Sequence, residues 1–123
     1  MKNRIQIILL GLILTVIIVS CKSTAQTNSK VPDSYRLVVS FISKGGGISM
    51  DTHEKFEKFL KDHPKKPIVE NYRWGREGEI DYCSNLKELS KKEQVTFIEE
   101  IKKIVAGSDV VLLTENTPCV HKK

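Results

Sequence analysis

The chain has 123 residues, of which 40% are hydrophobic and 28% are charged, and its formal net charge is +5. This length suits one domain rather than two, and the composition excludes collagen-like, mucin-like and wholly disordered chains. The lysines stand in short pairs interleaved with glutamates, whereas a nucleic-acid binder would show a denser basic stripe. We therefore interpret the lysines as a solvated surface and expect no nucleic-acid partner.

The N-terminal segment has the layout of a secretory signal. A short basic stretch, Met1–Arg4, precedes a predominantly apolar run of 15 residues from Ile5 to Val19. This run is shorter than the ~20 residues that a permanent membrane-spanning helix needs, and no cluster of positive charge follows it as a stop-transfer signal. The pattern predicts that the basic end stays inside while the rest of the chain is exported.

The apolar run ends in Ile18-Val19-Ser20-Cys21, which resembles the lipobox of bacterial lipoproteins. In that family the cysteine thiol receives a diacylglyceryl group, the signal peptide is cut before the cysteine, and the new amine is acylated, for instance with palmitate. The resemblance implies cleavage between Ser20 and Cys21 and a lipid anchor on Cys21. It covers residues 1–21 only, and Ile18 and Ser20 replace the commoner Leu and Gly or Ala. An ordinary signal peptide and an uncleaved anchor are the alternatives.

The residues after the lipobox indicate where such a lipoprotein would be placed. Lys22 stands where enterobacterial lipoproteins of the inner membrane carry Asp. The resemblance therefore implies anchoring in the cell outer membrane, with the domain in the periplasm. Residues 22–33 are small and polar and lack apolar periodicity, which predicts a flexible tether. The folded domain is then expected to comprise residues 34–123.

The first half of this domain reads as a strand followed by a helix. Tyr35–Ser43 is rich in β-branched and aromatic residues, which predicts a strand that ends at three glycines. Asp51 and Glu54 have the spacing of a capping box. They predict a helix over 52–62 that stops at His63-Pro64.

Two short strands and a glycine-rich loop follow. Residues 67–74 and 79–83 are the predicted strands, and the two glycines of Gly75–Gly78 suit a hairpin loop that needs positive φ. Ser90 and Glu93 form a second capping box, which predicts a helix that ends before a glycine.

The short apolar run in 109–115 predicts a last, buried strand, and residues 116–123 are expected to be irregular. The order β-α-β-β-α-β favours a four-stranded antiparallel sheet with both helices on one face. The fold class predicted is therefore α+β, a two-layer ferredoxin-like sandwich. Because this fold hosts many unrelated functions, it licenses no activity by itself.

Two cysteines remain in the domain once Cys21 is lipidated. In an exported protein, Cys83 and Cys119 invite a disulfide, which would add roughly 3–4 kcal/mol for a loop of this length. However, the third and fourth strands are not neighbours in the predicted sheet. Only a C-terminal tail folded back across the sheet would bring the two thiols together, so paired and independent cysteines both remain open.

Neither a metal site nor an anion site has a clear signature. His53, His63, Cys119 and His121 lack the spacing of a metal-binding motif, so we expect no metal and no cofactor. Gly45–Gly47 lies between a strand and a helix, as an anion-binding loop does. It lacks the Gly-Lys-Ser/Thr of phosphate-binding loops, so a mobile turn is the simpler interpretation.

The predicted hairpin carries the residue types that dominate binding hot spots. These partner-binding candidates are Tyr72, Arg73, Trp74, Arg76 and Tyr82. The alternative is that Tyr72 and Trp74 complete the core under the helices. The sheet face away from the helices is expected to be bare, with Val38 and Ile42 pointing outward, so a partner or a second copy could cover it.

Four carboxylates lie on the same hairpin: Glu70, Glu77, Glu79 and Asp81. Strand periodicity places Glu79 and Asp81 on one face, as a general acid and base would be. Solvated charges on a hairpin explain them without any chemistry, no histidine lies close in sequence, and no nucleophile motif accompanies them.

The sequence therefore predicts a lipid-anchored envelope protein whose domain binds a protein or an envelope component and is not an enzyme. The alternative is a periplasmic enzyme, or a sensor of a small ligand or anion, that uses Gly45–Gly47 and the hairpin carboxylates. A third hypothesis is a purely structural envelope protein.

Overall fold

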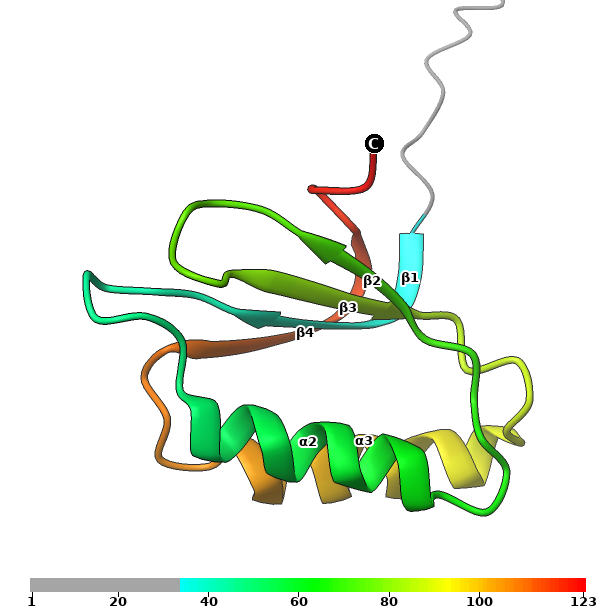
Figure 1. Ribbon diagram of the computed structural model, residues 1–123. Coiled ribbons are helices and arrows are strands. Elements are labelled where there is room, and N and C mark those ends of the chain that lie inside the picture. The colour runs from blue at the N-terminus through cyan, green and yellow to red at the C-terminus, as the bar shows by residue number, and fades with distance from the viewer. Residues whose placement is uncertain (1–33) are drawn as a thin grey trace, which may run out of the picture.

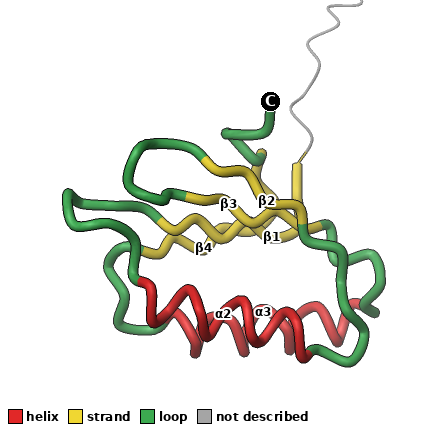
Figure 2. The backbone as a smooth tube through the Cα atoms, viewed as in Figure 1, coloured by secondary structure: helices red, strands yellow, loops and turns green. Residues whose placement is uncertain are grey.

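The structure is a computed structural model that describes residues 34–123; the predicted signal peptide, cleavage site, lipidated cysteine and tether lie outside the described residues. The elements are β1 (Ser34–Phe41), α2 (Met50–Asp62), β2 (Glu70–Arg73), β3 (Ile80–Ser84), α3 (Lys91–Val105) and β4 (Val111–Pro118). This order confirms the predicted β-α-β-β-α-β sequence. Both helices lie against the same face of the sheet, which gives two layers (Figures 1 and 2).

The sheet has the order β2-β3-β1-β4, and all of its neighbouring strands are antiparallel. Each helix therefore joins two parallel strands that have one antiparallel strand between them. Right-handed crossovers place both helices on one side, so the two-layer ferredoxin-like sandwich is confirmed.

The main core lies between the sheet and the helices. Strand β1 supplies Val39 and Phe41, and the helices supply Phe56 and Phe97; each is at most 1% exposed. Alternation along β1 and helical spacing along α2 and α3 direct these apolar side chains into one layer. Their burial is the main stabilising contribution to the sandwich.

The two helices begin in different ways. Helix α3 has the predicted capping box, in which the Ser90 hydroxyl accepts from the Glu93 amide and the Glu93 carboxylate accepts from the Ser90 amide. The capping box predicted at Asp51 and Glu54 was wrong. Helix α2 begins at Met50 with Ser49 as its N-cap, so Asp51 is already helical and pairs with Lys55 at 2.6 Å.

Two strand boundaries differ from the prediction. Strand β2 begins at Glu70 rather than at Pro67, a residue that has no amide hydrogen for the ladder. Strand β4 continues to Pro118, because Thr117 and Pro118 pair with the first two residues of β1. The irregular region therefore begins later than predicted.

Within residues 34–123, neither helix combines the length and the apolar character that a membrane span requires.

Glu93 makes the start of α3 sensitive to acid. A hydrogen bond from Lys65, together with the hydrogen bonds to Ser90, lowers its pKa from 4.5 to about 2. A carboxyl whose pKa is lowered by folding stabilises the folded state above its unfolded pKa, and this contribution is lost as the pH falls through the folded value. We therefore expect the native chain to lose more stability between about pH 5 and pH 2 than Glu93→Gln does.

Urea denaturation at a series of pH values measures this difference. The matched control is Glu54→Gln, on an exposed residue of α2 that makes no ion pair with any described residue. The interpretation fails if Glu93→Gln and the native chain follow parallel curves over that range.

Candidate functional site

The sheet face opposite the helices is covered by the end of the chain. We call residues Cys119–Lys123 the C-terminal tail; it leaves β4 and lies on this face (Figure 1). Cys119 forms a disulfide with Cys83 of β3, with 6.1 Å between the two Cα atoms. Together with Val38 and Tyr35 these cysteines form a second, smaller core. The sequence left open whether Cys83 and Cys119 pair. They do form a disulfide, because the tail folds back across the sheet.

This arrangement corrects the expectation of a bare sheet face. Val38, which was expected to point toward a partner, is 4% exposed beneath the tail. Ile42 is half-buried at the end of β1. The tail therefore occupies part of the face on which a partner or a second copy was expected.

The tail completes a cluster of three polar side chains, Trp74, Asp81 and His121, which we call the Trp–Asp–His cluster. The Asp81 carboxylate is 0% exposed and accepts from Trp74 Nε1 at 3.0 Å and from His121 Nδ1 at 2.6 Å. The rings of Trp74 and His121 stack with their centroids 4.0 Å apart and their planes 14° apart. One buried carboxylate thus fixes the positions of both rings.

A second polar network fastens the tail at the other end of the same face. Glu70 accepts from the Tyr35 hydroxyl at 2.7 Å and from the Tyr72 hydroxyl, and Lys122 donates to Tyr35. The hydrogen bonds from Tyr72 and Tyr35 lower the pKa of Glu70, and the bond to Glu70 raises the pKa of Tyr72 to about 12. The hydrogen bond to Tyr35 raises the pKa of Lys122. The network therefore keeps its acid and its base charged at neutral pH.

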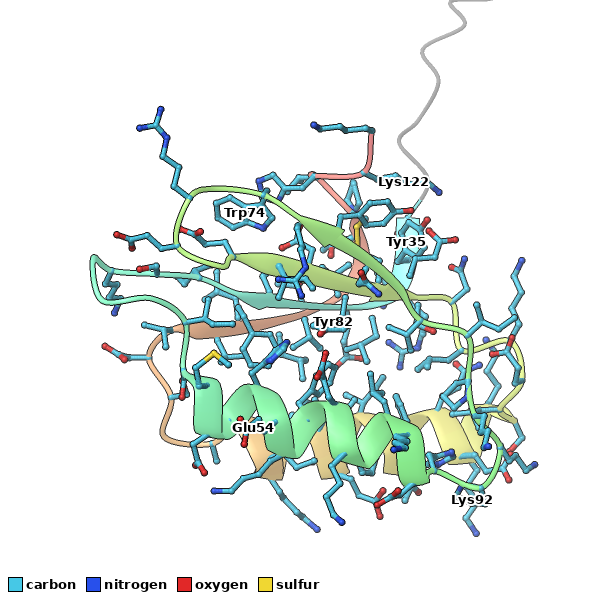
Figure 3. All side chains as sticks on the ribbon, viewed as in Figure 1. Tyr35, Glu54, Trp74, Tyr82, Lys92 and Lys122 are labelled. Atoms are coloured by element: carbon cyan, nitrogen blue, oxygen red, sulfur yellow. A yellow bond between two sulfur atoms is a disulfide. The ribbon has the colours of Figure 1, made fainter. Side chains whose placement is uncertain are left out.

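The partner-binding candidates separate into two faces. Trp74 lies on the sheet side away from the helices (Figure 3). Tyr72 packs against the second core on that side, so the alternative that places both in the core under the helices is wrong. Arg73 and Arg76 are exposed on the same hairpin. Tyr82 lies between the sheet and the helices and is only 5% exposed (Figure 3). The prediction for Tyr82 is thus corrected, since a partner cannot reach it.

Tyr82 instead belongs to a polar contact within the main core. Its hydroxyl donates to Glu57 Oε1 at 2.7 Å and lies 2.7 Å from His53 Nε2. Burial, followed by the hydrogen bond to Glu57, raises the pKa of Tyr82. His53 packs edge-on against Phe41 with ring centroids 4.9 Å apart, so this histidine is a satisfied core residue.

The hairpin carboxylates organise the loop between β2 and β3. Glu79 is 9% exposed, and its carboxylate accepts from the Glu77 amide at 2.8 Å. Gly75 has a φ of +67°, which favours glycine, and a Cβ there would force the Glu79 carboxylate to move. The interpretation of Glu79 and Asp81 as solvated charges is therefore wrong, because Glu79 is a buried support for the loop and Asp81 is fully buried.

The glycine-rich loop after β1 is organised in a similar way. The amides of Gly45 and Gly47 both donate to Ser43 Oγ at 3.0 Å, and the Ser43 hydroxyl donates to Glu77. A bound anion would need those amides and would lie beside the Glu77 carboxylate. The geometry thus disfavours an anion site at this loop.

The histidines and cysteines do not assemble into a metal centre among the described residues, where no group of three potential ligands gathers. Cys119 is committed to the disulfide. His63 lies at the end of α2 and packs against Phe59 and Phe97. Comparison of the chain with protein-family models, curated proteins and solved structures finds no match.

Sequence reasoning missed the contact between Asp81 and His121, which are 40 residues apart. The signal that could have found it is the Cys119-Val120-His121 spacing. Once Cys119 pairs with Cys83, a histidine two residues later must lie near the strand that carries Asp81. The link was missing because the disulfide itself was an open alternative.

Asp81 is expected to contribute strongly to stability. Replacing it by alanine leaves two N–H donors, on Trp74 and His121, without their acceptor, so Asp81→Ala should lower the free energy of unfolding by about 3 kcal/mol. The control His121→Ala removes a donor that is 34% exposed, so water replaces it at the carboxylate and the free energy of unfolding should fall by only about 1 kcal/mol. Urea denaturation monitored by Trp fluorescence measures both values. An Asp81→Ala effect no larger than the control would contradict this role for the carboxylate.

Proposed function

We propose that this chain is a lipid-anchored protein of the bacterial envelope whose domain binds another protein or an envelope component without catalysing a reaction. The anchor rests on the resemblance of residues 18–21 to a lipobox. The Cys83–Cys119 disulfide supports export, because disulfides persist mainly in oxidising compartments.

The observation that carries the binding proposal is the rigid presentation of Trp74. This side chain is half-buried, and its ring is fixed by the hydrogen bond to Asp81 and by the stack on His121. An aromatic ring already held in one position loses little conformational entropy on binding. Exposed Arg76 lies in the same loop. A fixed Trp and an exposed Arg in one loop combine two of the three residue types that are most enriched in binding hot spots.

The groups on which the sensor alternative depended are engaged within the chain. The amides of Gly45 and Gly47 donate to Ser43, and Glu79 supports the hairpin loop. These hydrogen bonds stabilise the two loops, and this role accounts for the positions of the amides and the carboxylate. This use of the polar groups favours a binding module over an anion sensor.

One observation favours the enzyme alternative. A histidine whose Nδ1 is bonded to a carboxylate has Nε2 left for proton transfer, and His121 is held in this way by Asp81. The variant His121→Phe separates the two functions, because phenylalanine keeps an aromatic ring against Trp74 and removes the base. Partner binding should survive this change, whereas acid–base catalysis would be lost.

The anchor is tested by the mass of the intact protein extracted from membranes of a bacterial host. We expect a mass equal to residues 21–123 plus acyl groups, with two thiols that can be alkylated only after reduction. The control Cys21→Ser should carry no lipid. A full-length mass without acyl groups in the native chain would overturn the assignment of the anchor.

The binding surface is tested by a photo-crosslinking amino acid placed at Arg76 of the membrane-anchored chain. We expect a discrete adduct that weakens by at least about tenfold when Trp74→Ala is added, as for a hot-spot residue. The matched control is the same crosslinker at exposed Glu54, on the helix side of the molecule (Figure 3). The same adduct at Glu54, or an adduct at Arg76 that does not respond to Trp74→Ala, would refute this surface.

A further inference from the structure

A groove of about 760 Å³ runs between α2 and α3 on the outer surface of the helix layer. Its apolar lining consists of half-buried Phe59, exposed Pro64, and Leu89 and Phe97, which are already buried within the chain. Exposed apolar surface in a groove is a feature that association would bury.

The charges along this groove are mostly paired within the chain. Three ion pairs use five of the seven Lys, Asp and Glu side chains that line the groove; these pairs are Lys55–Asp51, Lys58–Asp62 and Lys65–Glu93. The other two lining charges are Lys92 and Glu100, which have no ion-pair partner among the described residues. They have opposite signs, and Lys92 projects from the helix layer away from the sheet (Figure 3).

The positions of these two charges have a simple symmetry. Lys92 and Glu100 both lie on α3, and each is four residues from Thr96, which lines the same groove. At 1.5 Å per residue, they stand about 6 Å to either side of Thr96 along the helix. A surface with opposite charges at equal distances from a central point is complementary to its own copy rotated by 180°.

We propose that a second copy of this chain docks on the groove, with α3 antiparallel to α3 of the partner subunit and the two-fold axis at Thr96. Lys92 then faces Glu100 of the partner subunit, and Glu100 faces Lys92 of the partner subunit. Burial of the exposed apolar surface of Phe59 and Pro64 provides the affinity, and the two charge pairs set the register. The sheet side, with the Trp–Asp–His cluster, stays free for another partner.

A cysteine on the two-fold axis tests this geometry directly. In Thr96→Cys, the two introduced thiols meet at the axis, so mild oxidation of membranes that contain the full chain should give a dimer on a non-reducing gel. The matched control is Lys103→Cys, an exposed residue seven positions further along the same helix face. Its two copies would be about 21 Å apart along α3, which is too far for a disulfide.

The proposal is overturned if Thr96→Cys gives no dimer, or if Lys103→Cys gives as much dimer as Thr96→Cys. The first result is also what a lipid or a foreign peptide in the groove would produce, and the second is what random collision would produce. Neither result affects the adduct expected at Arg76, so dimerisation and partner binding fail independently.

Charge reversal tests the register separately. In the Thr96→Cys background, Lys92→Glu or Glu100→Lys alone should lower the dimer yield by about tenfold, because two attractions become two repulsions. Co-expression of the two single variants should restore dimers that contain one chain of each, and the double variant should also recover. Circular dichroism establishes that each variant is folded. Reversed charges that leave the yield unchanged, or mixtures that do not recover it, would overturn the antiparallel pairing.

Discussion

A two-layer sandwich can cover only one face of its sheet with its own helices, and in this small domain the other face carries Val38 and Cys83 of the central strands. The Cys83–Cys119 disulfide holds the tail across that face, and the tail then covers these side chains. A crosslink between residues 36 apart also restricts the unfolded chain, which stabilises the fold by roughly 3–4 kcal/mol. This covalent bond therefore anchors the tail residues that complete the second core and both polar networks.

The most distinctive chemistry of the molecule follows from the position of the tail. With Cys119 fixed on β3, His121 reaches Asp81 and stacks on Trp74. A fully buried carboxylate would destabilise the fold if its charge were unpaired, and here it is satisfied by two N–H donors. The same contacts hold the half-buried ring of Trp74 in one position, so the stability of the fold and the proposed recognition would share one set of residues.

The two proposed interaction surfaces lie on opposite sides of the molecule. The Trp–Asp–His cluster is on the sheet side, whereas the groove of Lys92, Thr96 and Glu100 is on the helix side. Contacts on one surface therefore do not occlude the other. A dimer joined through the helices would present two copies of Trp74 at once, and two linked weak contacts bind far more tightly than one.

The sequence by itself determined the elements and their order. Apolar alternation predicted the strands, and the Ser90–Glu93 pair predicted the start of α3, because these signals depend on residues only a few positions apart. Two boundaries were predicted wrongly. Ser49 rather than Asp51 stands at the N-cap position of α2, and β4 extends through Thr117 and Pro118 because these residues pair with β1.

Only the tertiary structure decided the candidate site. Period-two alternation predicts that Asp81 and Cys83 share one face of the sheet and that Tyr82 lies on the other. It does not indicate which of the two faces the helices cover. The packing of α2 and α3 placed Tyr82 in the core and left Asp81 on the side that the tail reaches. Contacts between residues 36 to 40 positions apart, such as Cys83–Cys119 and Asp81–His121, leave no local periodicity, because their free energy depends on the path of the whole chain.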